Sequence, residues 1–147
     1  MGIETAWADG GGDARPVVRR LATLADDRGT LMVADAGQEM PFRAERFFLI
    51  CDVPAGAVRA RHAHRRCRQL LCCIAGACTV ETLGETGGAV NRLDGPHVAL
   101  DVPPWTWVEC RDFTPEARLL VLCSTPYDPA DLVEDLEEFQ AELSRRR

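Results

Sequence analysis

Short apolar segments separated by turn-forming residues are the feature of this sequence that most restricts its fold. The segments are rich in Val, Leu, Phe, Cys and Thr, and Gly, Pro or Asp interrupts them at intervals of roughly ten residues. This spacing is typical of an all-β sandwich or barrel, and no repeat of fixed period points to a solenoid or propeller. The predicted strands are Leu31–Ala34, Arg46–Val53, Gln69–Ile74, Cys78–Thr82, His97–Val102, Thr106–Cys110 and Arg118–Cys123.

The two ends of the chain depart from this pattern. Residues 1–16 predict a flexible tail, and residues 17–125 then form the barrel domain. Residues 126–147 predict a short C-terminal α-helix, because Asp128 is a capping residue, Pro129 suits the first helical position and the first turn is acidic. Apolar residues at helical spacing predict that one face of this helix packs on the barrel. They are Leu132, Leu136, Phe139 and Leu143.

Composition argues against several classes of function. The chain of 147 residues has a net charge of −6, which disfavours general nucleic-acid binding. No apolar run reaches the length of about 20 residues that a membrane span needs. The seven cysteines are odd in number and lack zinc-finger spacing. Since no export signal is recognisable, we interpret them as reduced, mostly buried thiols and expect a cytoplasmic protein of one domain.

Positive charge is concentrated around a pair of histidines. A local cationic site in an acidic protein suits a small anionic ligand such as a phosphate or diphosphate. The positive charge comes from five arginines close to the histidines in sequence. On strand alternation alone, about half of these arginines are expected to point away from such a site. They are Arg59, Arg61, Arg65, Arg66 and Arg68.

His62 and His64 are two of only three histidines in the chain. Residues i and i+2 of a strand share a face, so both imidazoles are expected to point into one cavity, and Arg66 extends the same row. Two imidazoles on one wall suit either a metal site or proton transfer near neutral pH.

The stretch around these histidines resembles the first motif of the cupin family. Gly56 and Gly76 stand in the register of that motif, but Gln69 occupies the position of its glutamate. In the second motif, Val108 stands where a third histidine would be. Two imidazoles and a neutral amide are a weak set of ligands for a divalent metal. The resemblance therefore implies a metal-free cupin, a double-stranded β-helix or jelly-roll barrel that uses no cofactor.

Further motifs are similar to those of the sugar 3,4-ketoisomerases, which act on dTDP-4-keto-6-deoxyglucose. The similarity extends from about Leu21 to Phe139, and so over nearly the whole domain. The matching stretches are residues 26–31, 41–48, 62–65 with Gln69, 93–96, 102–109 and 127–139.

This second resemblance implies an activity and a set of site residues. The family moves a ketone from C4 to C3 of the hexose through an enediolate, in metal-free homodimers that exchange N-terminal strands. His64 is then the first choice for the base or proton shuttle, with His62 as its partner in positioning or in the second proton transfer. A place for Trp107 in the barrel core is equally compatible with the sequence. The implied contacts to a dTDP-linked keto sugar are Arg28, Arg46, Arg65, Gln69 and Trp107.

Two departures from the family pattern keep other functions open. Phe48 stands where relatives carry a tyrosine, and Val108 where they carry a polar or basic residue. One alternative is a non-catalytic nucleotide-sugar-binding cupin, which the missing tyrosine permits. Another is a metal-dependent cupin enzyme that uses His62, His64 and His97. The configuration of the product at C4 and the base of the nucleotide are not specified by the sequence.

Overall fold

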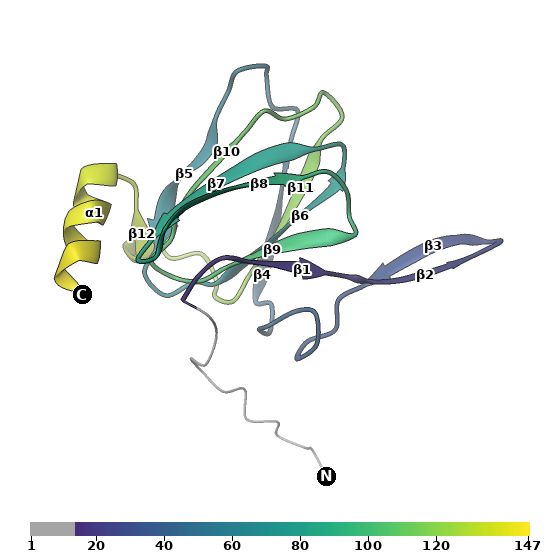
Figure 1. Cartoon of the computed structure of the whole chain (residues 1–147), viewed down its shortest axis with the longest axis horizontal. Coiled ribbons are helices and arrows are strands. Elements are labelled where there is room, and N and C mark those ends of the chain that lie inside the picture. Colours follow the sequence, from purple (N-terminus) through teal and green to yellow (C-terminus); the bar gives the residue numbers. More distant parts are fainter. Residues whose placement is uncertain (1–13) are drawn as a thin grey trace, which may run out of the picture.

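The computed structural model describes residues 14–147, and the predicted tail lies almost wholly outside them. Two five-stranded antiparallel sheets face each other and form a jelly-roll barrel (Figure 1). The order in the first sheet is β1 (Val17–Arg20), β9 (Val98–Val102), β6 (Gln69–Ala75), β11 (Arg118–Cys123) and β4 (Arg46–Cys51). The order in the second is β12 (Leu132–Val133), β5 (Arg59–His64), β10 (Trp107–Arg111), β7 (Cys78–Gly84) and β8 (Gly87–Leu93). The prediction of an all-β cupin barrel is confirmed.

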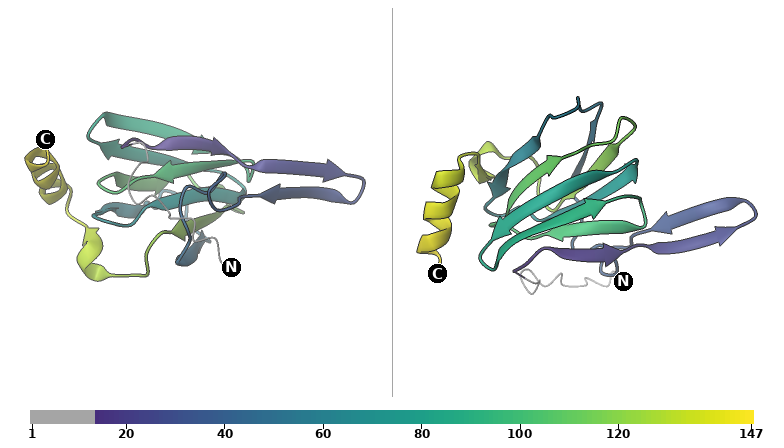
Figure 2. Two further views of the ribbon diagram at one scale, coloured as in Figure 1. Left: turned by 90° about the horizontal axis from the view of Figure 1, so that it is seen from below. Right: turned by 45° about the horizontal axis from the view of Figure 1, so that its top comes forward.

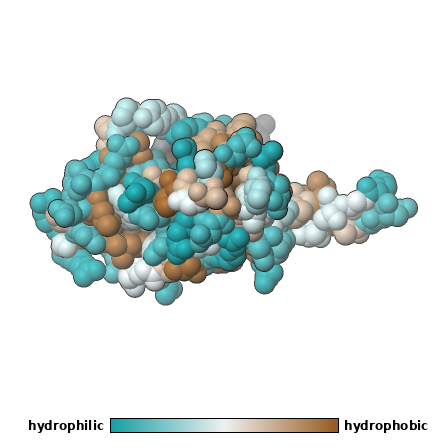
Figure 3. Space-filling model, turned by 90° about the horizontal axis from the view of Figure 1, so that it is seen from above, coloured by the Kyte–Doolittle hydropathy of each residue, from teal (hydrophilic) through white to brown (hydrophobic). Residues whose placement is uncertain are grey.

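A two-stranded arm extends from the barrel. Strands β2 (Ala22–Asp26) and β3 (Gly29–Val33) pair only with each other and project away from both sheets (Figures 1 and 2). Leu24 and Leu31 lie opposite each other on this arm, with 63% and 58% of their surface exposed. Figure 3 shows the arm as a projection with a hydrophilic tip and apolar patches along its stem. The arm has no core of its own within the described part of the chain.

The C-terminal segment differs from its prediction. Asp128 caps a single 3-10 turn, η1 (Pro129–Asp131), and the chain then adds β12 to the edge of β5 before α1 (Leu136–Arg145) begins. The prediction that one helix starts at Pro129 is therefore wrong, because the backbone of β12 pairs with β5 instead. Asp135 is the actual cap of α1, and its side chain accepts a hydrogen bond from the backbone N–H of Glu138 at 2.8 Å.

Helix α1 packs on the outer face of the second sheet, at the end of the molecule away from the arm (Figures 1 and 2). Only two residues of the predicted apolar stripe make this contact, because Leu132 lies on β12 and Leu136 is exposed. Phe139 and Leu143 are buried, and they pack with Trp107, Ala63 and Val133. The described residues contain no helix that is both long enough and apolar enough to cross a membrane.

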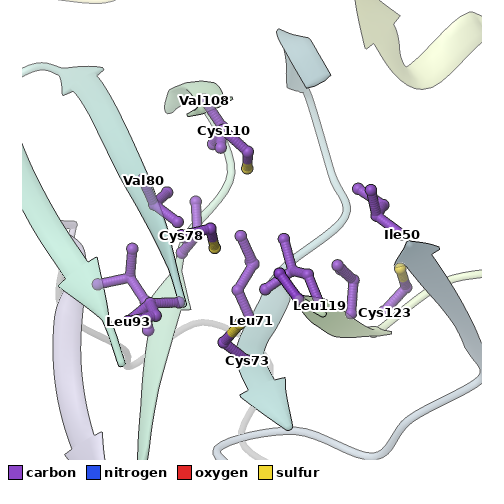
Figure 4. Close-up of a cluster of buried hydrophobic side chains, with 14 of the residues drawn as sticks. Ile50, Leu71, Cys73, Cys78, Val80, Leu93, Val108, Cys110, Leu119 and Cys123 are labelled. Atoms are coloured by element: carbon purple, nitrogen blue, oxygen red, sulfur yellow. The ribbon is translucent and has the colours of Figure 1, made fainter. Parts of the chain in front are cut away.

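The main core fills the space between the two sheets. Six of the seven cysteines are buried as free thiols, whereas Cys51 is exposed. They behave as small apolar residues and pack among aliphatic side chains. Figure 4 shows part of this cluster, with Cys73, Cys78, Cys110 and Cys123 among Ile50, Leu71, Val80, Leu93, Val108 and Leu119.

Candidate active site

A cavity of about 260 Å³ opens at one end of the barrel core. Its walls come from β4, β5, β6, β10 and β11, and most of them are apolar, with Phe48, Leu71 and Val108 among them. Two of the predicted site residues, His62 and Gln69, line this cavity. A pocket with few polar groups in an apolar wall is the usual form of a small-molecule site.

A β-bulge in β5 determines which side chains reach the cavity. Val108 of β10 pairs with His62, but the next residue, Glu109, pairs with Ala60, so Arg61 has no partner in the ladder. Ala60 and Arg61 have φ angles of 68° and 62°, a left-handed backbone that is uncommon outside glycine. Strain of this kind is concentrated at functional sites. Because of the bulge, both Arg59 and His62 line the cavity, which strict alternation would forbid.

His62 is held as a neutral imidazole. Burial lowers the pKa of His62 below its ordinary value of 6.5, and electrostatic repulsion between protonated imidazoles at His62 and His64 lowers it further. The two rings lie edge to face, with their centroids 5.0 Å apart. A neutral imidazole in a partly dehydrated cavity can accept a proton at physiological pH.

His64 is bound to a carboxylate behind the cavity. Its Nδ1 lies 2.9 Å from Oδ2 of Asp131, so Nδ1 carries the proton and donates it to the carboxylate. Asp131 is buried and also accepts hydrogen bonds from the backbone N–H groups of Arg66 (2.6 Å) and Cys67 (3.2 Å). Burial by itself raises the pKa of Asp131, but the bonds with His64 and the two N–H groups outweigh it and hold that pKa below its ordinary value.

Two arginines fix the segment that carries Asp131. The guanidinium of Arg65 donates to the carbonyls of Ala130 (3.1 Å) and Leu132 (2.9 Å) and to Glu142 of α1 (2.8 Å). Arg66 pairs with Asp128 at 2.6 Å. We call Arg65, Arg66 and residues 128–133 the C-terminal clasp. It positions Asp131 against His64 from outside the barrel.

Gln69 and Arg46 lie at or beside the cavity. Gln69 is buried, and its Nε2 lies 3.5 Å from Sγ of Cys123. The guanidinium of Arg46 lies over the rings of Phe48 and Tyr127, at 5.0 and 5.1 Å from their centroids. Since Phe48 is a cavity wall, Arg46 is placed next to the cavity although it is not part of its lining.

The structure places three other predicted contacts away from the cavity. Trp107 precedes Val108 on β10 and so faces the opposite side, where its ring packs 5.8 Å from that of Phe139. Arg65 is engaged by the C-terminal clasp. Arg28 lies at the tip of the arm, where it pairs with Asp26, and its side chain is 86% exposed.

The ligands of a cupin metal do not come together here. His97 lies just before β9, is half exposed and has its Nε2 3.7 Å from Asp94, so it does not join His62 and His64. The alternative in which His62, His64 and His97 together bind a metal is therefore wrong. Val108 and Gln69 at the remaining ligand positions offer one methyl-bearing side chain and one neutral amide. This set of donors does not fit a divalent cation in the cavity.

Comparisons with known proteins agree with this geometry. The profile of the family described as "FdtA: WxcM-like, C-terminal" matches residues 15–144. The chain belongs to this family. A relative, the TDP-4-oxo-6-deoxy-alpha-D-glucose-3,4-oxoisomerase of Aneurinibacillus thermoaerophilus, is 31% identical over 124 residues, which are 83% of this chain and 88% of the relative. The resemblance inferred from the motifs is thereby confirmed.

Solved structures extend the comparison. The sugar 3,4-ketoisomerase of Thermoanaerobacterium thermosaccharolyticum, in complex with TDP, has a TM-score of 0.85 at 27% identity and covers 89% of this chain and 96% of its own. A mutant of that enzyme was solved with TDP-4-keto-6-deoxyglucose. The 3,4-ketoisomerase of Helicobacter canadensis has a TM-score of 0.85 at 26% identity, with 90% of this chain and 99% of its own covered.

Two residues of the site in this WxcM-like chain were not identified from the sequence. Asp131 stands in an acidic stretch that was interpreted as the first turn of a helix, and nothing in the local pattern separates it from Asp128. Arg59 was one of several arginines near the histidines, and only the bulge at Arg61 brings it to the cavity. A more general signal was available for Asp131, because it belongs to the stretch 127–139 that carries the family resemblance.

Proposed function

We propose that this protein is a sugar-nucleotide 3,4-ketoisomerase that converts TDP-4-keto-6-deoxyglucose to a TDP-3-keto-6-deoxyhexose. The observation that carries the proposal is a neutral His62 in an apolar cavity, backed by the His64–Asp131 pair, in a chain whose relatives bear the names of such enzymes. The reaction needs a base beside a carbonyl and no outside oxidant, which fits a cavity without a metal-ligand set.

The atoms balance within the substrate. His62 removes the proton from C3, and the electrons of that C–H bond form a C3–C4 double bond while the C4 carbonyl oxygen becomes an enolate oxygen. The proton of the C3 hydroxyl then passes to the C4 oxygen, C4 takes up a proton, and the ketone is left at C3. No electrons are exchanged with another molecule, so the change is an isomerisation.

The geometry favours a different division of roles between the histidines from the one inferred from sequence. His62 lines the cavity and is therefore the better placed base, whereas Nδ1 of His64 is committed to Asp131. Asp131 fixes the tautomer and ring orientation of His64, as the third group does in hydrolytic triads. His64 then positions the ring of His62 through their edge-to-face contact.

Charged and polar groups around the cavity suit a sugar diphosphate. Arg59 lines the cavity but is exposed to solvent, which places a cation at the mouth, where a diphosphate would lie. Gln69 reaches the interior and offers a neutral amide to the sugar. Arg46 adds a second positive charge beside Phe48. We propose these three side chains as the contacts to substrate within one chain.

A second copy of the chain is the proposed partner of the arm. An isolated two-stranded hairpin is at best marginally stable in water, and Leu24 and Leu31 expose apolar surface on this one. Exchange of the N-terminal strands in a homodimer would cover that surface and carry Arg28 toward the partner's barrel. Light scattering on the purified protein is expected to give twice the chain mass, and Leu24→Lys with Leu31→Lys is expected to reduce it to one chain. A wild-type monomer would contradict this.

The activity is tested directly by incubation with TDP-4-keto-6-deoxyglucose in D₂O. Nuclear magnetic resonance is expected to show a new 3-keto sugar, with deuterium at C3 or C4. If titration shows that the sugar nucleotide binds and yet neither signal appears, the protein is the non-catalytic nucleotide-sugar-binding cupin that Phe48 permits. If it does not bind at all, this substrate is wrong.

A further inference from the structure

Three side chains of different chemistry meet behind the cavity. His64, Cys67 and Asp131 each offer a ligand atom, and these atoms all lie within 4.8 Å of one another. Cys67 and Asp131 are 3% and 2% exposed, and the side chain of His64 is 12% exposed. The cluster shares one cupin ligand position, His64, but uses none of the other three, at His62, Gln69 and Val108.

We propose that His64, Cys67 and Asp131 form a binding site for a zinc-class divalent cation, and that its occupancy inhibits the enzyme. An imidazole nitrogen, a thiolate and a carboxylate oxygen are the ligand types of Zn²⁺, and three protein ligands with one water are a common tetrahedral set. Among the described residues, this is the group of His, Cys, Asp or Glu side chains whose ligand atoms come close enough together to share one ion, and it combines a soft thiolate with borderline and hard donors.

Charge balance favours the bound ion. Binding of Zn²⁺ releases the proton of the Cys67 thiol to solvent, and the neutral imidazole of His64 exchanges its proton from Nδ1 to Nε2, so that Zn–S and Zn–N bonds form without the loss of a second proton. The cation is then matched by one thiolate and one carboxylate, so that the buried cluster is neutral. Buried charges that are paired in this way are tolerated.

The ligands are largely held in place before any ion arrives. Asp131 is fixed by the backbone N–H groups of Arg66 and Cys67, and the same segment brings the thiol of Cys67 beside it. The His64–Asp131 separation of 2.9 Å must widen slightly, because Zn–N and Zn–O bonds of about 2.0–2.2 Å place such ligands a little over 3 Å apart.

Inhibition follows from the loss of one hydrogen bond, and this consequence rests on the proposed function. A metal on Nδ1 of His64 replaces the proton that this nitrogen donates to Asp131. The metal then sets the orientation of the His64 ring in place of Asp131, so that this ring no longer positions His62 as the proposed reaction requires. Binding of the metal, in contrast, does not depend on what the cavity catalyses.

Cobalt tests the site by a signal that needs no substrate. Titration of the reduced protein with Co²⁺ is expected to give a thiolate-to-cobalt charge-transfer band that saturates at one equivalent per chain. Cys67→Ser is expected to lose the band, while Cys51→Ser, which removes the exposed cysteine on β4, keeps it. X-ray absorption of the zinc-loaded wild-type protein is expected to show that the zinc ion has one sulfur neighbour together with nitrogen and oxygen neighbours. Because this measurement uses the wild type, it does not depend on whether a variant folds.

Activity assays then test the consequence. Zn²⁺ is expected to inhibit the wild type and Cys51→Ser reversibly, with recovery on chelation, and Cys67→Ser is expected to need at least tenfold more Zn²⁺. A first shell without sulfur, or a cobalt band that survives Cys67→Ser, overturns the site. A chain that binds Co²⁺ through Cys67 but shows no ketoisomerase activity supports the site and overturns the proposed function instead.

Discussion

The cavity and the C-terminal clasp lie on either side of the end of β5 and treat its two histidines differently. The cavity surrounds His62 with apolar walls and lowers its pKa, whereas the clasp presents His64 with a buried carboxylate that is itself held by backbone N–H groups. One residue separates them in sequence. A HisXHis motif can therefore supply one group for proton transfer and a second group that positions the first.

The largest expected effect comes from the cavity side. His62→Asn removes the proposed base while keeping a polar side chain of similar size, and kcat is expected to fall by about 10²–10⁴-fold, the usual contribution of general acid–base catalysis. Calorimetry is expected to show that TDP still binds. A variant with more than about a tenth of wild-type kcat would remove His62 from the role of base.

Loss of the carboxylate in the clasp should have the next largest effect. Asp131→Asn keeps the shape but offers Nδ1 of His64 a weaker, neutral acceptor, and kcat is expected to fall by about 10–10²-fold, as for other groups that orient a functional histidine. Asp128→Asn is the matched control, because Asp128 belongs to the same segment but pairs with Arg66. Equal losses in both variants would mean that the segment as a whole, and not the carboxylate on His64, matters.

The pH dependence of the reaction tests the environment of His62 in the cavity without any mutation. The pKa of His62 is lowered from 6.5, so kcat/KM is expected to be constant at neutral pH and to fall only below pH 6.5, by about tenfold per unit once His62 is protonated. The unfolded chain takes up this proton first as the pH drops, so this group also makes folding less favourable below 6.5. His97→Gln should leave the profile unchanged, since His97 is half exposed and remote. An acid limb centred above 6.5 contradicts the cavity environment.

The smallest effect is expected at the outer layer of the clasp. Arg65→Lys loses the planar fork that joins Ala130, Leu132 and Glu142, but it keeps the charge. Because these contacts are partly open to water, kcat is expected to fall by less than about tenfold. Glu142→Gln should produce a similar loss, and the double variant should be no worse than either alone. Additive losses would show that Arg65 and Glu142 do not act through the same contact.

Much of the barrel could be predicted because strand periodicity is local. The β11 strand, Arg118–Cys123, matches its prediction, since apolar residues bounded by turn signals specify it without reference to the rest of the chain. The β8 strand was missed because its first residues, Gly87 and Gly88, were interpreted as part of a turn. The short β12 strand was missed because only the free edge of β5 makes Leu132 and Val133 a strand.

The site was less predictable because its geometry is not local. Strict alternation places Arg59 on the opposite face from His62, and only the bulge at Arg61 brings both to the cavity. Trp107 was assigned to the cavity although its neighbour Val108 already faces it. Asp131 lies far from His64 in sequence, and the pairing of β12 with β5 that joins them is set by tertiary packing. The position of the motif identified the right strand, whereas tertiary packing determines which of its side chains line the cavity.

The division of roles between the two histidines is tested most directly with substrate that carries deuterium at C3. Mass spectrometry and nuclear magnetic resonance follow the loss of that deuterium from C3, whether it passes to solvent or to C4. We expect rapid loss with the wild type, slower loss with His64→Asn and none with His62→Asn. Loss at the wild-type rate with His62→Asn, together with none for His64→Asn, would show that His64 is the base and that the roles assigned here are reversed.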